Sequence, residues 1–130
     1  MKDKTRIMKT KIMGIINVTP DSFYAFSRTP EIDAAIVKAK EQIDQGVDYL
    51  DIGGESSRPG AHAISLEEEL QRVIPVVNAV CQNSKIGVSV DTRKPEVAEA
   101  AIKAGATLIN DISGFREKRM RVIGGKIWAG

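Results

Sequence analysis

Four short apolar segments of this sequence end at or near a side-chain carboxylate or amide. These polar residues are Asn17, Asp51, Asp91 and the Asn110–Asp111 pair. Carboxylate oxygens accept hydrogen bonds and an amide both accepts and donates, so the set can hold the donor-rich edge of an aminated heterocycle. The same residues can instead cap the helices that follow, with Asp91 bonding to backbone amides near Arg93. Capping and binding are compatible, and both interpretations stay open.

Asn17 opens a polar loop that contains Thr19, Asp21 and Ser22. Amide and carboxylate oxygens suit a hard cation such as Mg²⁺, especially one that already carries substrate phosphates. The alternative is an Asx-type turn in which Pro20 and Asp21 only shape the connection. Spacing alone does not separate these two interpretations.

The segment 51–60 (DIGGESSRPG) leads from a predicted strand into a loop with two hydroxyls and an arginine. Hydroxyls, glycine amides and a guanidinium group together form an anion site, and arginine matches phosphate oxygens well. A solvated surface loop is the alternative. Because Pro59 and Gly60 bend and stiffen the chain beside Arg58, we favour an anion site that includes Ser57 and Arg58.

Hydrophobic periodicity places these residues on alternating strands and helices. Strands are predicted over 11–17, 49–53, 86–91 and 107–111, each short and apolar like a buried parallel strand. The predicted helices begin at Thr29–Pro30, at Ser65 with Glu68 as a capping box, at Lys94–Pro95, and near Glu117. Gly46 and Gly105 end the first and third helices, and Pro75 is expected to kink the second or to cost stability there.

Four consecutive βα units predict an α/β fold with right-handed crossovers and a parallel sheet. Polar residues at the carboxyl ends of the strands favour a (β/α)₈ barrel, whose catalytic groups gather at that rim. An open sheet of the dinucleotide-binding kind more often has a GxGxxG turn after its first strand, which is absent here. Such barrels need about 250 residues, so 130 residues correspond to half of one.

Composition indicates a globular domain in a reducing compartment. The chain is 42% hydrophobic and 28% charged with a net charge of +2, and its one cysteine, Cys81, has no internal disulfide partner. We expect a cytoplasmic protein without a membrane span or secretory signal. Basic residues crowd both ends, but an aromatic content of 5% argues against nucleic-acid binding. Cys81 and His62 lack catalytic partners at suitable spacing, so both are expected to be structural or surface residues.

Several long motifs carry a family resemblance. They are 13–23 (MGIINVTPDSF), 51–61 (DIGGESSRPGA), 88–94 (VSVDTRK) and 106–115 (ATLINDISGF). In this order and at these separations, they closely resemble the pterin-binding family, specifically the dihydropteroate synthases of folate biosynthesis. On this resemblance, residues 1–130 form a partial pterin-binding domain, with residues 1–10 as a basic N-terminal extension.

The resemblance implies a (β/α)₈ barrel and a transferase that joins 6-hydroxymethyl-7,8-dihydropterin diphosphate to 4-aminobenzoate, releasing diphosphate. Asn17 would then ligate Mg²⁺. Ser57, where the family more often has threonine, and Arg58 would be catalytic and bind near the diphosphate and the aminobenzoate. Asp91 and Asn110 would hydrogen-bond the pterin, and Asp51 would support the rim. Members of the family are typically homodimers.

The sequence departs from the family pattern at two places. Residues 24–28 (YAFSR) replace the glycine pair that usually follows Phe23, and the chain stops before a fifth strand. We therefore expect the 130-residue chain to be inactive and prone to aggregate by itself. Two alternatives to the synthase remain: a pterin-binding module for methyl transfer from methyltetrahydrofolate to a corrinoid, and a non-catalytic half-barrel.

Overall fold

The computed structural model describes residues 9–19, 28–56 and 62–126. Strands and helices alternate along the chain. The strands are β1 (Met13–Asn17), β2 (Tyr49–Gly53), β3 (Gly87–Asp91) and β4 (Leu108–Asn110). The helices are α1 (Arg28–Asp44), α2 (Leu66–Asn83), α3 (Pro95–Ala104) and α4 (Lys118–Lys126). The predicted βα order is confirmed.

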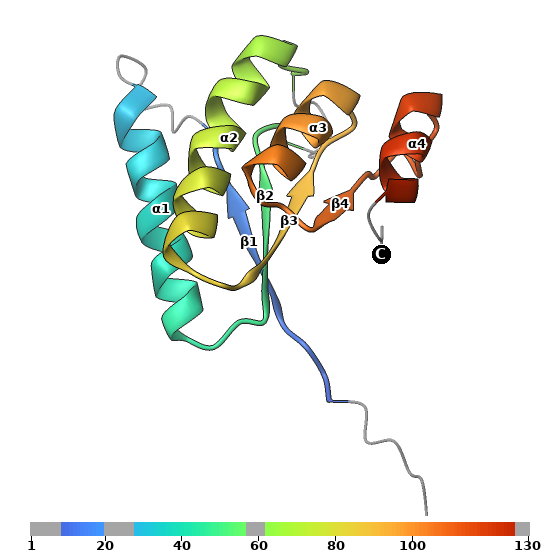
Figure 1. Ribbon diagram of the computed structural model, residues 1–130. Helices are drawn as coiled ribbons and strands as arrows, with labels where there is room; N and C mark the ends of the chain where they lie inside the picture. The colour runs from blue at the N-terminus through green and yellow to red at the C-terminus, as the bar shows by residue number, and fades with distance from the viewer. Residues whose placement is uncertain (1–8, 20–27, 57–61, 127–130) are drawn as a thin grey trace, which may run out of the picture.

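The four strands form one parallel sheet in the order β1-β2-β3-β4. Helices α1, α2 and α3 lie side by side on one face of this sheet, and α4 lies beyond β4 next to α3 (Figure 1). Each helix returns the chain so that the next strand pairs with the last one, as right-handed crossovers do. This is the arrangement of half of a (β/α)₈ barrel.

The helix-facing side of the sheet is the hydrophobic core. Its strand residues are at most 2% exposed: Ile16, Leu50, Ile52, Val88, Val90 and Ile109. They pack under equally buried helix residues, which include Ala39, Val73, Val77, Val97 and Ala101. Alternation along each strand therefore directs the other residues to the opposite face.

The opposite face of the sheet is apolar at the start of β1 and polar toward the strand ends. Met13 is 43% exposed and Ile15 is 59% exposed. Register places Ile15 beside Asp51, Asp51 beside Ser89, and Ser89 beside Leu108. This face corresponds to the interior of a barrel, and no described helix covers it (Figure 1).

Three predicted strands are longer than the observed ones, each for a local reason. Ile12 precedes the β1 ladder, where its amide donates to Oδ2 of Asp48 at 2.8 Å. The Ile86 amide donates to Oγ of Ser84, in a turn before β3. Asp111 follows β4, where its Oδ1 accepts from the Ser113 amide at 2.8 Å. Side-chain bonds to the backbone thus replace ladder bonds at these ends.

The helix ends at Ser65, Lys94–Pro95 and Gly105 follow the predicted chemistry. Ser65 caps α2 and accepts from the Glu68 amide at 3.1 Å, although the Glu68 carboxylate pairs with Arg72 instead of returning to Ser65. Gly105 ends α3 with φ of 118°, a left-handed conformation that glycine adopts without strain.

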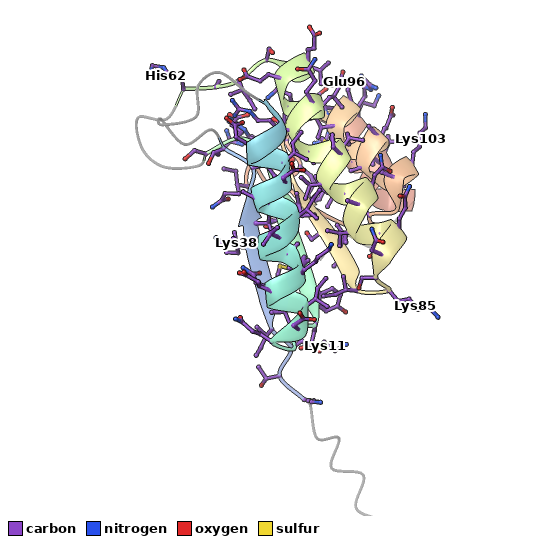
Figure 2. The ribbon with its side chains drawn as sticks, turned by 90° about the vertical axis from the view of Figure 1, so that its left-hand side faces the viewer. Lys11, Lys38, His62, Lys85, Glu96 and Lys103 are labelled. Carbon is purple, nitrogen blue, oxygen red and sulfur yellow. The ribbon has the colours of Figure 1, made fainter. Side chains whose placement is uncertain are left out.

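Two other predicted helix features need comment. The prediction that Thr29 caps α1 is wrong, because the helix already begins at Arg28. Helix α2 continues through Pro75, whose ring is exposed. His62 and Glu96 lie at one end of the molecule, and Lys11 and Lys85 lie at the other end (Figure 2). None of the described helices has the length and apolar character to cross a bilayer.

The central position of Leu50 predicts a large loss of stability on truncation. Leu50 is fully buried in β2 between two parallel neighbours. We expect Leu50→Ala to lower the free energy of unfolding by about 2–5 kcal/mol, because the lost methyl groups leave a cavity. Urea unfolding of the full chain measures the change. Val37→Ala, at a site 54% exposed, is the control and is expected to change stability little.

Candidate functional site

The carboxyl ends of the four strands bring three of the predicted site residues into one row. Register pairs Asn17 with Gly53, Gly53 with Asp91, and Asp91 with Asn110. Residues paired in this way point to the same face, which here is the face without helices. Asn17 and Asn110 are exposed and Asp91 is half-buried, so all three are open to a ligand.

Gly53 leaves room in this row. A Cβ at this position would lie 3.3 Å from Cβ of Asp91, closer than most real contacts of this kind. The absence of a side chain therefore lets the Asp91 carboxylate lie against the backbone of β2. Gly53 itself is buried, and it places main chain, with no side chain, between Asn17 and Asp91.

Asp51 lies two residues before the row, on the same face. It is only 6% exposed, and within the described residues its Oδ1 has no hydrogen-bond partner. Burial raises the pKa of the Asp51 carboxyl, and hydrogen bonding from Ser89 and Asn110 partly opposes that shift. A buried carboxylate oxygen without a donor is costly by itself and is well suited to a ligand donor.

The pKa of the Asp91 carboxyl is strongly raised. Burial, together with the negative charges of Asp51, Glu69, Asp111 and Glu55, raises its pKa from 3.8 to about 6. The carboxyl therefore changes charge close to neutral pH, and a ligand that donates hydrogen bonds would hold it ionised. Strongly perturbed acids facing an open region are typical of binding sites.

The turn after β3 is capped by Thr92 and not by Asp91. Oγ1 of Thr92 accepts from the Lys94 amide at 3.1 Å, so the capping role considered for Asp91 falls to its neighbour. The Asn110–Asp111 pair divides in a similar way. Asn110 stays in the row, while the buried Asp111 uses Oδ1 to accept from the amide and hydroxyl of Ser113. The Asp91 carboxylate thus remains available for a ligand, while the exposed Asn110 side chain also hydrogen-bonds to Asp51.

A charged cluster behind the row is the main feature that sequence analysis missed. Glu69 of α2 accepts from Oγ1 of Thr92 at 2.5 Å and from Nζ of Lys94 at 2.8 Å. Nζ of Lys94 also donates to Glu55 at 3.0 Å, and Arg93 donates to the same carboxylate at 2.5 Å. The available signal was a glutamate at a position of the apolar stripe of α2, one turn ahead of Val73.

The charges in this cluster stabilise each other. Burial acts to raise the pKa of Glu55, but hydrogen bonds from Lys94 and Arg93 outweigh it and hold the pKa below its usual value. Burial acts to lower the pKa of Lys94, but its bonds to Glu69 and Glu55 keep it raised. Both partners therefore stay charged at neutral pH.

The two predicted anion-site residues, Ser57 and Arg58, lie outside the described residues. The described part of their loop ends at Ser56, directly after Glu55. Cys81 is half-buried, and burial raises the pKa of its thiol, in keeping with a structural role. His62 is exposed. A cavity of about 300 Å³ between α1 and α2, lined in part by Ile43 and Val80, lies toward the opposite end of the strands.

Asn17 offers the hard-oxygen ligand expected of a magnesium site. Among the described residues, no group of three histidines, cysteines or acids could hold a metal by itself. Mg²⁺ commonly takes one or two protein oxygens and fills its other positions with water and substrate phosphates. A single exposed amide at the rim therefore fits Mg²⁺ that arrives with a diphosphate, and does not fit a permanently bound metal.

The comparisons with known proteins all point to one family of enzymes. The family model for pterin binding enzymes matches residues 13–125. A dihydropteroate synthase from Clostridium beijerinckii is 51% identical over 111 residues. A dihydropteroate synthase structure from Clostridium difficile, obtained in the presence of pteroic acid, matches with a TM-score of 0.84 at 47% identity and covers 97% of this chain. One from Xanthomonas albilineans with 4-aminobenzoic acid gives 0.82 at 43% identity over 92% of this chain.

The chain belongs to the pterin-binding enzyme family, because the family model covers most of its length. Within that family its close relatives are dihydropteroate synthases, as the motifs at the strand ends predicted. The chain spans 41% of the length of the Clostridium beijerinckii relative, and 48% and 45% of the two solved chains. The prediction of four βα units out of eight is confirmed.

The raised pKa of Asp91 predicts a pH-dependent penalty. Its pKa is about 6 in the fold and about 3.9 in an unfolded chain, so between these values the folded state binds more protons. Stability from this group is present below pH 4 and is lost as the pH rises through 6. Asp91→Asn should therefore raise the melting temperature at pH 8 and leave it nearly unchanged at pH 4. Thermal unfolding across this range measures the effect, and an equal gain at both pH values would contradict it.

Proposed function

We propose that this chain supplies the pterin-binding part of a dihydropteroate synthase. The observation that carries the proposal is the row Asn17, Gly53, Asp91 and Asn110. Two residues before it on the same face, the buried Oδ1 of Asp51 has no hydrogen-bond partner among the described residues. Pterins present amino and ring N–H groups. Carboxylate and amide oxygens in such a row would accept hydrogen bonds from these groups. The ligands in the related structures, pteroic acid and 4-aminobenzoic acid, support this assignment.

The reaction transfers the pterin methylene group from diphosphate to an arylamine. The lone pair of the 4-aminobenzoate nitrogen forms a bond to the methylene carbon while the carbon–oxygen bond to diphosphate breaks. Diphosphate leaves with that electron pair, and the nitrogen loses one proton. A neutral arylamine is already nucleophilic, so the chain must orient the pterin and stabilise the leaving charge.

The residues divide these tasks. Asp91 and Asn110 would hydrogen-bond to the edge of the pterin ring. Asp51, two residues before the row on the same face, would support both residues. Asn17 would ligate Mg²⁺, which would neutralise charge on the departing diphosphate. Ser57 and Arg58, which follow the Glu55–Ser56 segment in the sequence, would bind near the diphosphate and the aminobenzoate. Each of these roles is part of the proposal.

The whole protein's properties follow from the same assignment. We propose small-molecule substrates, a cytoplasmic location and assembly as a homodimer, as the family resemblance implies. The uncovered sheet face requires further barrel strands, so the proposed activity belongs to a completed barrel. The identity of 51% to a synthase supports this reaction over methyl transfer to a corrinoid.

Fragment complementation tests the function. The full chain is co-expressed with the part of the Clostridium beijerinckii synthase that follows its matched segment, and dihydropteroate formation is assayed. We expect activity from the pair, none from the chain by itself, and a loss of about 10- to 100-fold in kcat/KM for Asp91→Asn, because a charged hydrogen bond is lost in the bound state. Asp33→Asn, on the exposed side of α1, is the matched control.

A positive control makes a negative result meaningful. The Clostridium beijerinckii enzyme is divided at the same point and its own two parts are co-expressed. Activity from that pair, with none from the pair that contains this chain, would disprove the proposed function.

Asn17 predicts a specific magnesium dependence. In the complemented enzyme, Asn17→Ala should raise the Mg²⁺ concentration needed for half-maximal rate by about tenfold, the size expected for losing one polar contact to a charged group. The KM for 4-aminobenzoate should stay unchanged. Asn83→Ala, at the exposed end of α2, should leave both values alone. An unchanged Mg²⁺ requirement in Asn17→Ala would remove this residue from the metal site.

A further inference from the structure

One turn of α2 contacts both segments that follow the central strands. Arg72 donates from Nη1 to the carbonyl of Gly54, directly after β2, at 3.0 Å. Glu69, three residues earlier on the same helix, accepts from Oγ1 of Thr92, directly after β3. Residues three apart lie on one face of a helix, so this face of α2 spans the ends of two neighbouring strands.

Glu69 is the centre of these contacts. It is 1% exposed, and each of its oxygens accepts one bond, Oε2 from Thr92 and Oε1 from Nζ of Lys94. Lys94 also donates to Oε2 of Glu55, which lies beyond Gly54 in the same loop. A network of charge-assisted bonds thus joins the turn after β3 to the loop that leads to Ser57 and Arg58. Within it, Glu69 holds Thr92 and Lys94 of that turn, and Arg93 and Lys94 bond to Glu55 directly.

The positive and negative charges in this network balance. Two carboxylates, Glu55 and Glu69, face two cations, Lys94 and Arg93. A buried carboxylate is tolerated when it is paired and fully hydrogen-bonded, but removing one partner leaves an uncompensated charge. The network therefore favours one arrangement of both loops together over arrangements in which one loop has moved.

We propose that Glu69 is a positioning residue that fixes Thr92 and Lys94 in the turn after Asp91 and so maintains the Lys94–Glu55 bond, which couples this turn to the loop preceding Ser57 and Arg58. Glu69 is buried in α2 on the helix side of the sheet, so it acts by holding other residues. The coupling is a property of the fold. Its effect on two substrates rests on the proposed function, since it requires that the pterin bind at Asp91 and that 4-aminobenzoate bind near Ser57 and Arg58.

Hydrogen exchange on the full chain tests the coupling without any activity. Mass spectrometry follows peptides that cover 53–56 and 92–95 in wild type, Glu69→Gln and Glu55→Gln. Each variant removes a different carboxylate from this network. We expect exchange about tenfold faster in both peptides for both variants, the size expected for one lost charge-assisted bond. Glu67→Gln, an exposed neighbour in the first turn of α2, is the control and should match wild type.

Independent loops would give a different pattern. Glu55→Gln would then change only 53–56, and Glu69→Gln only 92–95, and either result would overturn the proposal. Glu55 is more exposed than Glu69, at 15% against 1%, so Glu55→Gln remains informative if the Glu69 variant unfolds.

Kinetics of the complemented enzyme provide the second readout. We expect both variants to raise the KM for the pterin diphosphate and for 4-aminobenzoate together, by about three- to tenfold, since both loops lose their arrangement. A merely structural residue would reduce the amount of active enzyme and so lower kcat alone, and that outcome would overturn the positioning role. If wild type forms no dihydropteroate, the proposed function fails, and the exchange pattern still decides the coupling.

Discussion

The in-register parallel ladder is the constraint on which the other features of this chain depend. Four strands pair so that Asn17, Gly53, Asp91 and Asn110 occupy one level at their carboxyl ends. A slip of one residue in any strand would turn its polar end toward the helices and its buried isoleucine or valine toward the open face. Core packing and the site are therefore specified by the same set of backbone hydrogen bonds.

Charge is distributed on the two sides of that ladder in different ways. On the open face, burial raises the pKa of both Asp51 and Asp91, and no cation among the described residues opposes that shift. On the helix side, Glu55 and Glu69 are matched by Lys94 and Arg93. The paired side stabilises the fold, whereas the unpaired side retains an electrostatic cost that a hydrogen-bond donor from a ligand would relieve.

Sequence alone identified the parts of this structure that depend on local or periodic signals. Asn17, Asp91 and Asn110 could be predicted because each ends a short apolar strand, and Ser65 because a cap needs only residues three apart. The bonds from Lys94 to Glu69 and Glu55 span 25 and 39 residues, so no local pattern shows them. The predicted strand ends were wrong for a related reason. The side chains of Ser84 and Asp48 accept hydrogen bonds from backbone amides that periodicity assigns to the strand ladder.

The distance between Asn17 and Asp91, which lie on either side of Gly53, limits how this region can change in evolution. The two side chains project from strands that are separated by one intervening strand, so their spacing is about twice the 4.8 Å that backbone hydrogen bonding imposes between neighbours. Point substitutions cannot adjust that width without disrupting the sheet. Substitutions can change which side-chain atoms surround Gly53. The distance between the strands that carry Asn17 and Asp91 is set by the geometry of backbone hydrogen bonding and stays the same.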